Sequence, residues 1–131
     1  NPLDGGINCG HIIDAVIARL DGSSPYAITA TTQRDGSWEE IETRHGTTFT
    51  WGKSFQQVYA EVKAGGPGTT HIVGMAGKKE AHVVVITNHN GTPVILEGQG
   101  GGAVIDSADE AAARYDPGFY GDGFTVGSAP L

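Results

Sequence analysis

The chain has 131 residues, a formal net charge of −7 at pH 7 and a single cysteine. The acidic balance argues against wrapping nucleic acid or lying on an anionic membrane, and no apolar run approaches the roughly eighteen residues of a membrane span. One cysteine excludes an internal disulfide. We therefore expect residues 1–131 to form one monomeric domain that folds without staples. Because the chain starts without Met, we expect it to be the C-terminal piece of a larger protein.

The first predicted element is a helix within residues 7–20, INCGHIIDAVIARL. Its apolar side chains recur at helical spacing, at Ile12, Ile13, Val16, Ile17 and Leu20. Asp21-Gly22 ends the helix, because Gly suits the left-handed position that closes a helix. Cys9 therefore stands where this helix begins.

Capping boxes predict the starts of three later helices. They pair Ser37 with Glu40, Ser54 with Gln57 and Ser107 with Glu110. The first helix would bury Trp38 and Ile41, and the third is short and rich in alanine. The second ends before Gly65-Gly66-Pro67, where no helix continues. Its apolar face consists of Phe55, Val58, Tyr59 and Val62.

Runs of β-branched and aromatic residues predict strands at residues 47–51, 71–76, 81–87 and 92–98. The sequence FTVG at residues 124–127, in a tail rich in glycine and aromatic residues, is a candidate last strand. Helices come first and strands follow. This order predicts an α+β fold with an antiparallel sheet.

A hairpin register can be worked out from Asn90-Gly91, which is the strongest short hairpin signal. If these two residues form the turn, paired residue numbers sum to 181, so that His82 faces Gln99 and residue 84 faces Glu97. Because side chains alternate along a strand, His82, Glu97 and Gln99 share one face. Glu97 is then the diagonal neighbour of His82, roughly 7–8 Å away between Cα atoms. The register predicts an imidazole with a carboxylate and an amide beside it.

Cys9 has the surroundings of a reactive thiol. The positive end of the helix dipole and the unpaired N–H groups of the first turn stabilise a thiolate. A nearby imidazolium lowers the thiol pKa further, and the same N–H groups can hold an oxyanion. Cys9, His82 and Glu97 thus supply the residue types of a nucleophile, its base and the group that orients the base.

Each of these residues also has a structural interpretation. A lone cysteine on an apolar helix face usually packs in the core, a lone histidine is often structural, and a glutamate at a strand end is often solvated. The context favours the site, since polar residues interrupt two otherwise apolar strands at positions that should be neighbours.

Other kinds of site find less support in the sequence. His11, His45, His71 and His89 lack the spacing of metal ligands, so we expect no metal and no cofactor. The glycine-rich stretches KAGGPGTT and EGQGGG lack the Gly-Lys-Ser/Thr of a phosphate-binding loop and are read as loops. No Gly-x-Ser-x-Gly occurs, so a serine hydrolase is not supported.

Two stretches carry a resemblance to a known family. The opening NPLDGGINCG with the helix that ends RLDGSSPYAI, and the later AHVVVITNHNGTPVILEGQGG, resemble the papain-fold toxin domains. These are also called toxin glutamine deamidase domains and occur at the C-termini of bacterial polymorphic toxins. The resemblance covers about residues 1–30 and 70–102. The chain differs from the family pattern at two positions. The family usually has Asp where Glu97 stands and often a second Cys where Ile12 stands.

The resemblance implies a papain-like fold in which an N-terminal helix carrying Cys9 packs on an antiparallel sheet carrying His82 and Glu97. By motif, Cys9 is the nucleophile, His82 the general base and Glu97 the acid that orients it. Asn8, which precedes the nucleophile, and Gln99, the amide of the acid-x-Gln element, are supporting or oxyanion candidates.

The resemblance also implies an activity. We expect a bacterial effector domain that deamidates a glutamine side chain of a target protein through a thioester on Cys9. A papain-like cysteine peptidase and a catalytically silent binding module of the same fold are the alternatives. A toxin domain further implies secretion or delivery into a target cell, action in its cytoplasm and a cognate immunity protein as partner.

Overall fold

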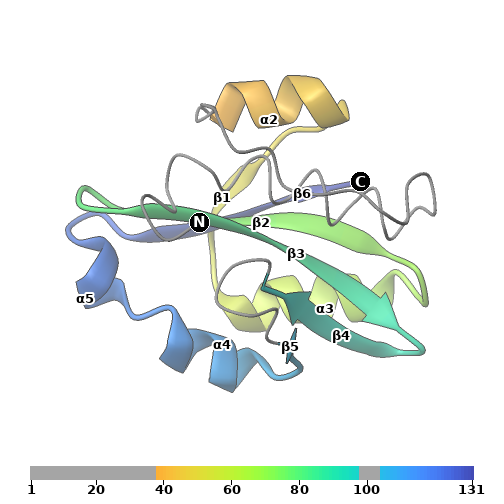
Figure 1. Cartoon of the computed structure of the whole chain (residues 1–131). Helices are drawn as coiled ribbons and strands as arrows, with labels where there is room; N and C mark the ends of the chain where they lie inside the picture. Colours follow the sequence, from red (N-terminus) through yellow and green to blue (C-terminus); the bar gives the residue numbers. More distant parts are fainter. Residues whose placement is uncertain (1–37, 98–103) are drawn as a thin grey trace.

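The computed structural model of the chain describes residues 38–97 and 104–131 (Figure 1). The helix expected in residues 7–20 and the candidate residues Asn8, Cys9 and Gln99 therefore lie outside the described residues. The described helices are α2 (Trp38–His45), α3 (Phe55–Ala64), α4 (Ala108–Arg114) and α5 (Pro117–Tyr120). The described strands are β1 (Thr50–Lys53), β2 (Thr70–Ala76), β3 (Ala81–His89), β4 (Thr92–Leu96), β5 (Val104–Ile105) and β6 (Thr125–Pro130).

The strands form one sheet in the order β1-β6-β2-β3-β4-β5, and every neighbouring pair is antiparallel. The predicted α+β class with an antiparallel sheet is therefore confirmed. The last strand of the chain, β6, is inserted between β1 and β2, so the C-terminal segment is an interior part of the sheet (Figure 1).

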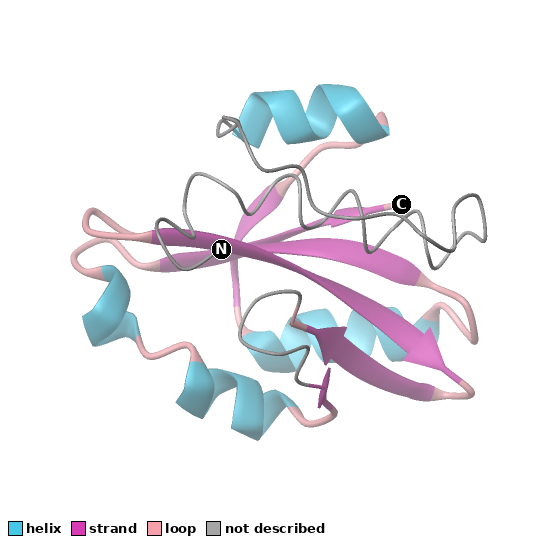
Figure 2. Ribbon diagram, in the orientation of Figure 1, coloured by secondary structure: helices cyan, strands magenta, loops and turns pink. Residues whose placement is uncertain are grey.

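Helices cover both faces of the sheet. Helix α2 lies on one side, and α3 and α4 lie on the other (Figure 2). Along β3 the residues alternate between the two: Val83 and Val85 pack toward α2, whereas Val84 and Ile86 join the core beneath α3 and α4. All four residues are buried, which explains why this strand reads as an uninterrupted apolar run in the sequence.

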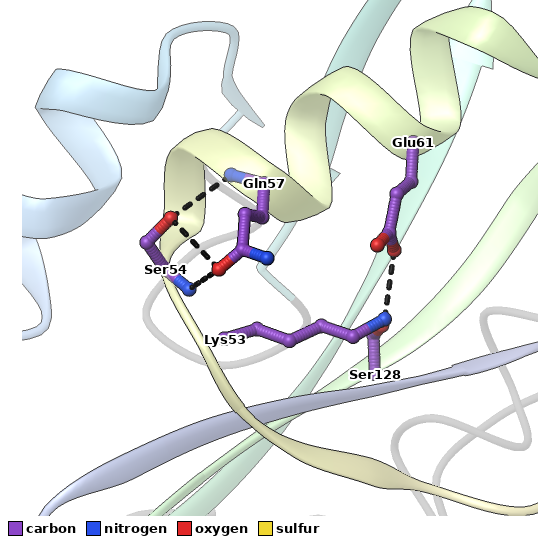
Figure 3. Close-up of polar contacts among 5 residues, drawn as sticks. All are labelled: Lys53, Ser54, Gln57, Glu61 and Ser128. Carbon is purple, nitrogen blue, oxygen red and sulfur yellow. Dashed lines mark hydrogen bonds and ion pairs between the residues drawn. The ribbon is translucent and has the colours of Figure 1, made fainter.

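The predicted helix starts are confirmed where the residues are described. Ser54 and Gln57 form a complete capping box at the start of α3: the Ser54 Oγ accepts from the Gln57 amide at 3.0 Å, and Gln57 Oε1 accepts from the Ser54 amide at 3.0 Å (Figure 3). Ser107 accepts the Glu110 amide at the start of α4. Ser37 lies outside the described residues, although α2 begins directly after it.

The hairpin register predicted from Asn90-Gly91 is confirmed from residue 85 to residue 96, including the pair His89–Thr92. Asn90 and Gly91 both have positive φ, at 55° and 96°, as the tight hairpin turn requires. Asn88 is 3 % exposed, and its side chain connects the hairpin turn to α3 by hydrogen bonds. Its Nδ2 donates to the Val62 carbonyl at the end of α3, and its Oδ1 accepts the Gly91 amide at 2.7 Å.

The strand predicted at residues 47–51 was placed too early, because β1 begins at Thr50. The amides of the preceding residues bond to α2 instead of a neighbouring strand. Thr47 N donates to the Glu42 carbonyl, and Phe49 N donates to Glu42 Oε2 at 2.7 Å. The strand propensity of residues 47–49 is overridden here, because hydrogen bonds from this segment close the end of α2. The short β5 and α5 were not predicted.

On the face of the sheet toward α2, three aromatic rings pack together, and two of them lie directly over glycines of the sheet. Trp38 and Trp51 pack with Phe49 at ring separations of about 5 Å. A Cβ on Gly74 would lie 2.7 Å from the Trp38 ring, and one on Gly127 would lie 2.6 Å from the Trp51 ring. The two tryptophans are therefore partly buried and pack against the core on this face, and the glycines are needed for their close approach.

Candidate functional site

His82 and Glu97 meet at one end of the sheet, on the face covered by α3 and α4. His82 is the second residue of β3, and Glu97 is the first residue after β4. The Nε2 atom of His82 lies 3.0 Å from both Glu97 Oε1 and Oε2. The carboxylate side chain is only 4 % exposed, and the imidazole is 13 % exposed. The contact expected from the hairpin register is therefore present.

A third residue, Tyr115, completes the contact and was missed by the sequence analysis. Its hydroxyl donates to Glu97 Oε2 at 2.7 Å, and its ring centre lies 6.0 Å from that of His82. Burial, together with the hydrogen bond to Glu97, raises the pKa of Tyr115 well above its ordinary value. The residue therefore stays protonated and acts as a donor at neutral pH. The only sequence signal was indirect: a tyrosine at the end of an amphipathic helix needs a partner for its hydroxyl when it is buried.

The contact with Glu97 bears on the imidazole tautomer. An ionised carboxylate only accepts hydrogen bonds, so opposite an ionised Glu97 the proton of the contact lies on Nε2. The neutral ring then carries its lone pair on Nδ1, and that atom is the basic position of the ring. A pair of this kind presents a base of fixed orientation from a buried carboxylate, which is what general base catalysis needs.

A second polar cluster on the same face of the sheet connects β1, α3 and β6 (Figure 3). Lys53 Nζ lies 2.8 Å from Glu61 Oε1 and 3.0 Å from the Ser128 hydroxyl. Ser128 is 1 % exposed, so its hydroxyl is out of reach of a substrate. Within the described residues, we therefore interpret this cluster as a structural clamp.

Three further features of the described residues concern other kinds of site. In the described ranges 38–97 and 104–131, no group of three or more His, Cys, Asp or Glu residues could hold a metal ion. No helix within these same ranges is long and apolar enough to cross a membrane. A surface pocket of about 430 Å³ lies between the β2–β3 turn and α5. Its lining consists of Lys78, Lys79, Pro117, Gly118, Gly121 and Asp122.

Comparison with known families identifies one match. The family described as papain fold toxin 1, glutamine deamidase, matches residues 7–102. The matched range includes Cys9, His82 and Glu97, whereas Tyr115 lies beyond its end. No curated protein gives a significant match to the chain.

Proposed function

The chain belongs to the papain fold toxin 1, glutamine deamidase, family, and from this premise we propose that it deamidates a glutamine side chain of a protein in the cell to which it is delivered. Cys9 is the nucleophile, His82 the general base and Glu97 the acid that orients the base. The observation that supports this assignment is the buried contact of His82 Nε2 with both carboxylate oxygens of Glu97 at 3.0 Å. In the proposed mechanism, the basic lone pair of the imidazole is on Nδ1.

In the proposed first step, the Cys9 sulfur attacks the side-chain amide carbon of the substrate glutamine and forms a tetrahedral oxyanion. Amides at the start of the Cys9 helix, with Asn8 or Gln99, would stabilise the oxyanion. The carbon–nitrogen bond then breaks, and ammonia leaves with a proton from His82. The substrate remains bound as a thioester of Cys9.

In the second step, His82 takes a proton from a water molecule, and the resulting hydroxide attacks the thioester carbon. The carbon–sulfur bond breaks, which regenerates the thiolate and releases glutamate. Glu97 acts throughout by holding the imidazole, and it stabilises the imidazolium when this forms. The proposed reaction steps use no metal and no redox cofactor.

The proposal includes where the domain works and what controls it. A domain of a toxin family is delivered to a target cell, and we propose that this one acts in the cytoplasm there. We further propose that a cognate immunity protein binds the domain and blocks its site in the producing cell. With 15 acidic against 8 basic residues, the chain favours basic patches on the contact face of that partner.

The experiment that tests the proposed function is incubation of the domain with lysate of target cells, followed by peptide mass spectrometry. We expect one glutamine of some protein to become glutamate, with one added negative charge and an intact chain. Cys9→Ala should abolish the conversion. New N-termini without conversion of a glutamine would indicate a peptidase. Neither product, with tight binding of one protein by both the wild type and Cys9→Ala, would indicate a binding module.

A further inference from the structure

The Glu97 carboxylate receives hydrogen bonds from two elements that are far apart in the chain. His82 reaches it from β3, and Tyr115 reaches it from the C-terminal end of α4. The two contacts are not equivalent. Nε2 of His82 is equally distant from both oxygens, at 3.0 Å, whereas the Tyr115 hydroxyl binds Oε2 alone at 2.7 Å. The hydroxyl therefore holds the carboxylate at a second point and from a second direction, in addition to the imidazole.

Tyr115 is held firmly enough to serve as such an anchor. Its side chain is 4 % exposed, its ring stacks on Phe55 with centres 5.7 Å apart, and its amide donates to the Ala111 carbonyl at 2.9 Å. Phe55 belongs to α3, which is itself fixed by the Ser54–Gln57 capping box. The donor position is thus supported by α3 and α4, and Tyr115 is also part of the buried core that these helices form over the sheet.

We propose that Tyr115 is a positioning residue of the site: its hydroxyl fixes the Glu97 carboxylate, and through it the ring of His82. Glutamate has one more rotatable bond than aspartate, and a carboxylate that turns away from Nε2 lets the imidazole rotate. Within the described residues, the hydroxyl of Tyr115 reaches the site through Glu97, so we propose that it acts through Glu97. Because Tyr115 lies outside the family match at residues 7–102, this contact does not follow from family membership. The catalytic consequence rests on the proposed function.

The test compares Tyr115→Phe with Tyr59→Phe. Both substitutions remove one hydroxyl from a buried ring, since Tyr59 is 7 % exposed and donates to the Ile105 carbonyl at 2.8 Å. Both should lower stability by a similar amount, but only Tyr115 contacts the site. Cys9 is the only thiol of the chain, so its alkylation by iodoacetamide can be measured without interference.

At pH 6, we expect Tyr115→Phe to alkylate about 3- to 10-fold more slowly than the wild type, because a disordered imidazolium stabilises the thiolate less. Near pH 10 the rates should coincide, since the thiolate is then formed in any case. Tyr59→Phe should leave the rates at both pH values unchanged. In a Glu97→Ala background, Tyr115→Phe should have no further effect, as expected for a residue that acts through Glu97.

Two results would overturn the inference: an equal slowing by both tyrosine variants, or the same effect of Tyr115→Phe with and without Glu97. A separate measurement does not depend on Cys9. By nuclear magnetic resonance, the His82 Nε2 proton should exchange with water at least several-fold faster in Tyr115→Phe and not in Tyr59→Phe.

If the wild-type thiol alkylates like an ordinary one, with a pKa of about 8.5, the proposed nucleophile fails. The exchange rate of the His82 proton then decides the role of Tyr115. Unchanged exchange overturns that role, and faster exchange in Tyr115→Phe alone supports it.

Discussion

Two acid–base contacts lie on the same face of the sheet, one of them buried and the other partly exposed, and we propose a catalytic role for the first alone. At the Glu97 contact the acid is 4 % exposed and its partner is an imidazole, the side-chain type that most often serves as a general base. At the Lys53 contact the acid, Glu61, is 41 % exposed and its partner is an ammonium group. A base must gain and lose a proton in each cycle. Under the proposed function, we assign that role to the imidazole of the first contact.

The two contacts also differ in the further side chain that each of them binds. The Glu97 carboxylate accepts a hydrogen bond from Tyr115, whose pKa is raised by burial and by this same hydrogen bond. The ammonium of Lys53 instead bridges α3 to the buried hydroxyl of Ser128 in β6, and thereby ties the first and last described strands to a helix (Figure 3).

The largest effect should come from His82→Ala. We expect deamidation to fall by about 10³-fold or more, because the thiolate loses its counter-ion and the leaving ammonia its proton donor. His89→Ala is the matched control, since His89 is exposed at the other end of the same strand. It should retain near-normal activity. Similar losses in the two variants would mean that β3 matters only as a strand, and the contrast between the two contacts would disappear.

A smaller loss is expected at Glu97. Glu97→Ala should lower the deamidation rate by about 10²-fold, because the imidazole loses its orientation. Glu97→Gln should be milder, since an amide oxygen can still accept the Nε2 proton. Steady-state rates with the modified protein as substrate would measure both. Equal and negligible effects would assign the orienting role to another acid, such as Asp106, or to none.

At the structural clamp, Lys53→Met should change stability and leave activity unaffected. We expect a loss of about 1–2 kcal/mol in the free energy of unfolding, because the buried Ser128 hydroxyl loses a partner and a partly exposed ion pair contributes little. Urea denaturation would measure it. The rate per folded molecule should stay within about twofold of the wild type. A large loss of activity in a stable Lys53→Met protein would contradict the distinction drawn here.

The smallest effect concerns His71, whose pKa is lowered from its ordinary value of 6.5 mainly by burial. Among the described residues, its Nδ1 has no hydrogen-bond partner, and Glu61 and Lys53 are the charges that act on it. At acid pH, His71 therefore binds fewer protons in the folded protein than in the unfolded chain. The contribution of His71 to stability should be complete above about pH 6.5 and be lost as the pH falls from there through the lowered pKa.

Urea midpoints measured between pH 5 and pH 8 (on the order of one pH unit either side of the ordinary value) would detect this loss. His71→Leu should reduce the slope of midpoint against pH in the acid range, and His89→Ala should not. An unchanged slope in His71→Leu would show that the buried imidazole does not contribute to acid sensitivity.

Local signals in the sequence determined much of the described secondary structure and the register of one hairpin. Asn90-Gly91 sets the register of β3 and β4, and the alternation of side chains then brings His82 and Glu97 to the same face. Ser54 with Gln57 begins α3. These interactions act over a few residues, so turn chemistry, capping and periodicity suffice to predict them.

Only the tertiary structure decided which distant segments meet. Nothing near β6 in the chain indicates that it inserts between β1 and β2, and nothing near Tyr115 indicates that its hydroxyl will bind Glu97, 18 residues away. Lys53 and Ser128 are 75 residues apart and meet only because β1 pairs with β6. Such contacts depend on how whole faces pack, and an apolar face in the sequence shows that it will be buried but not against what.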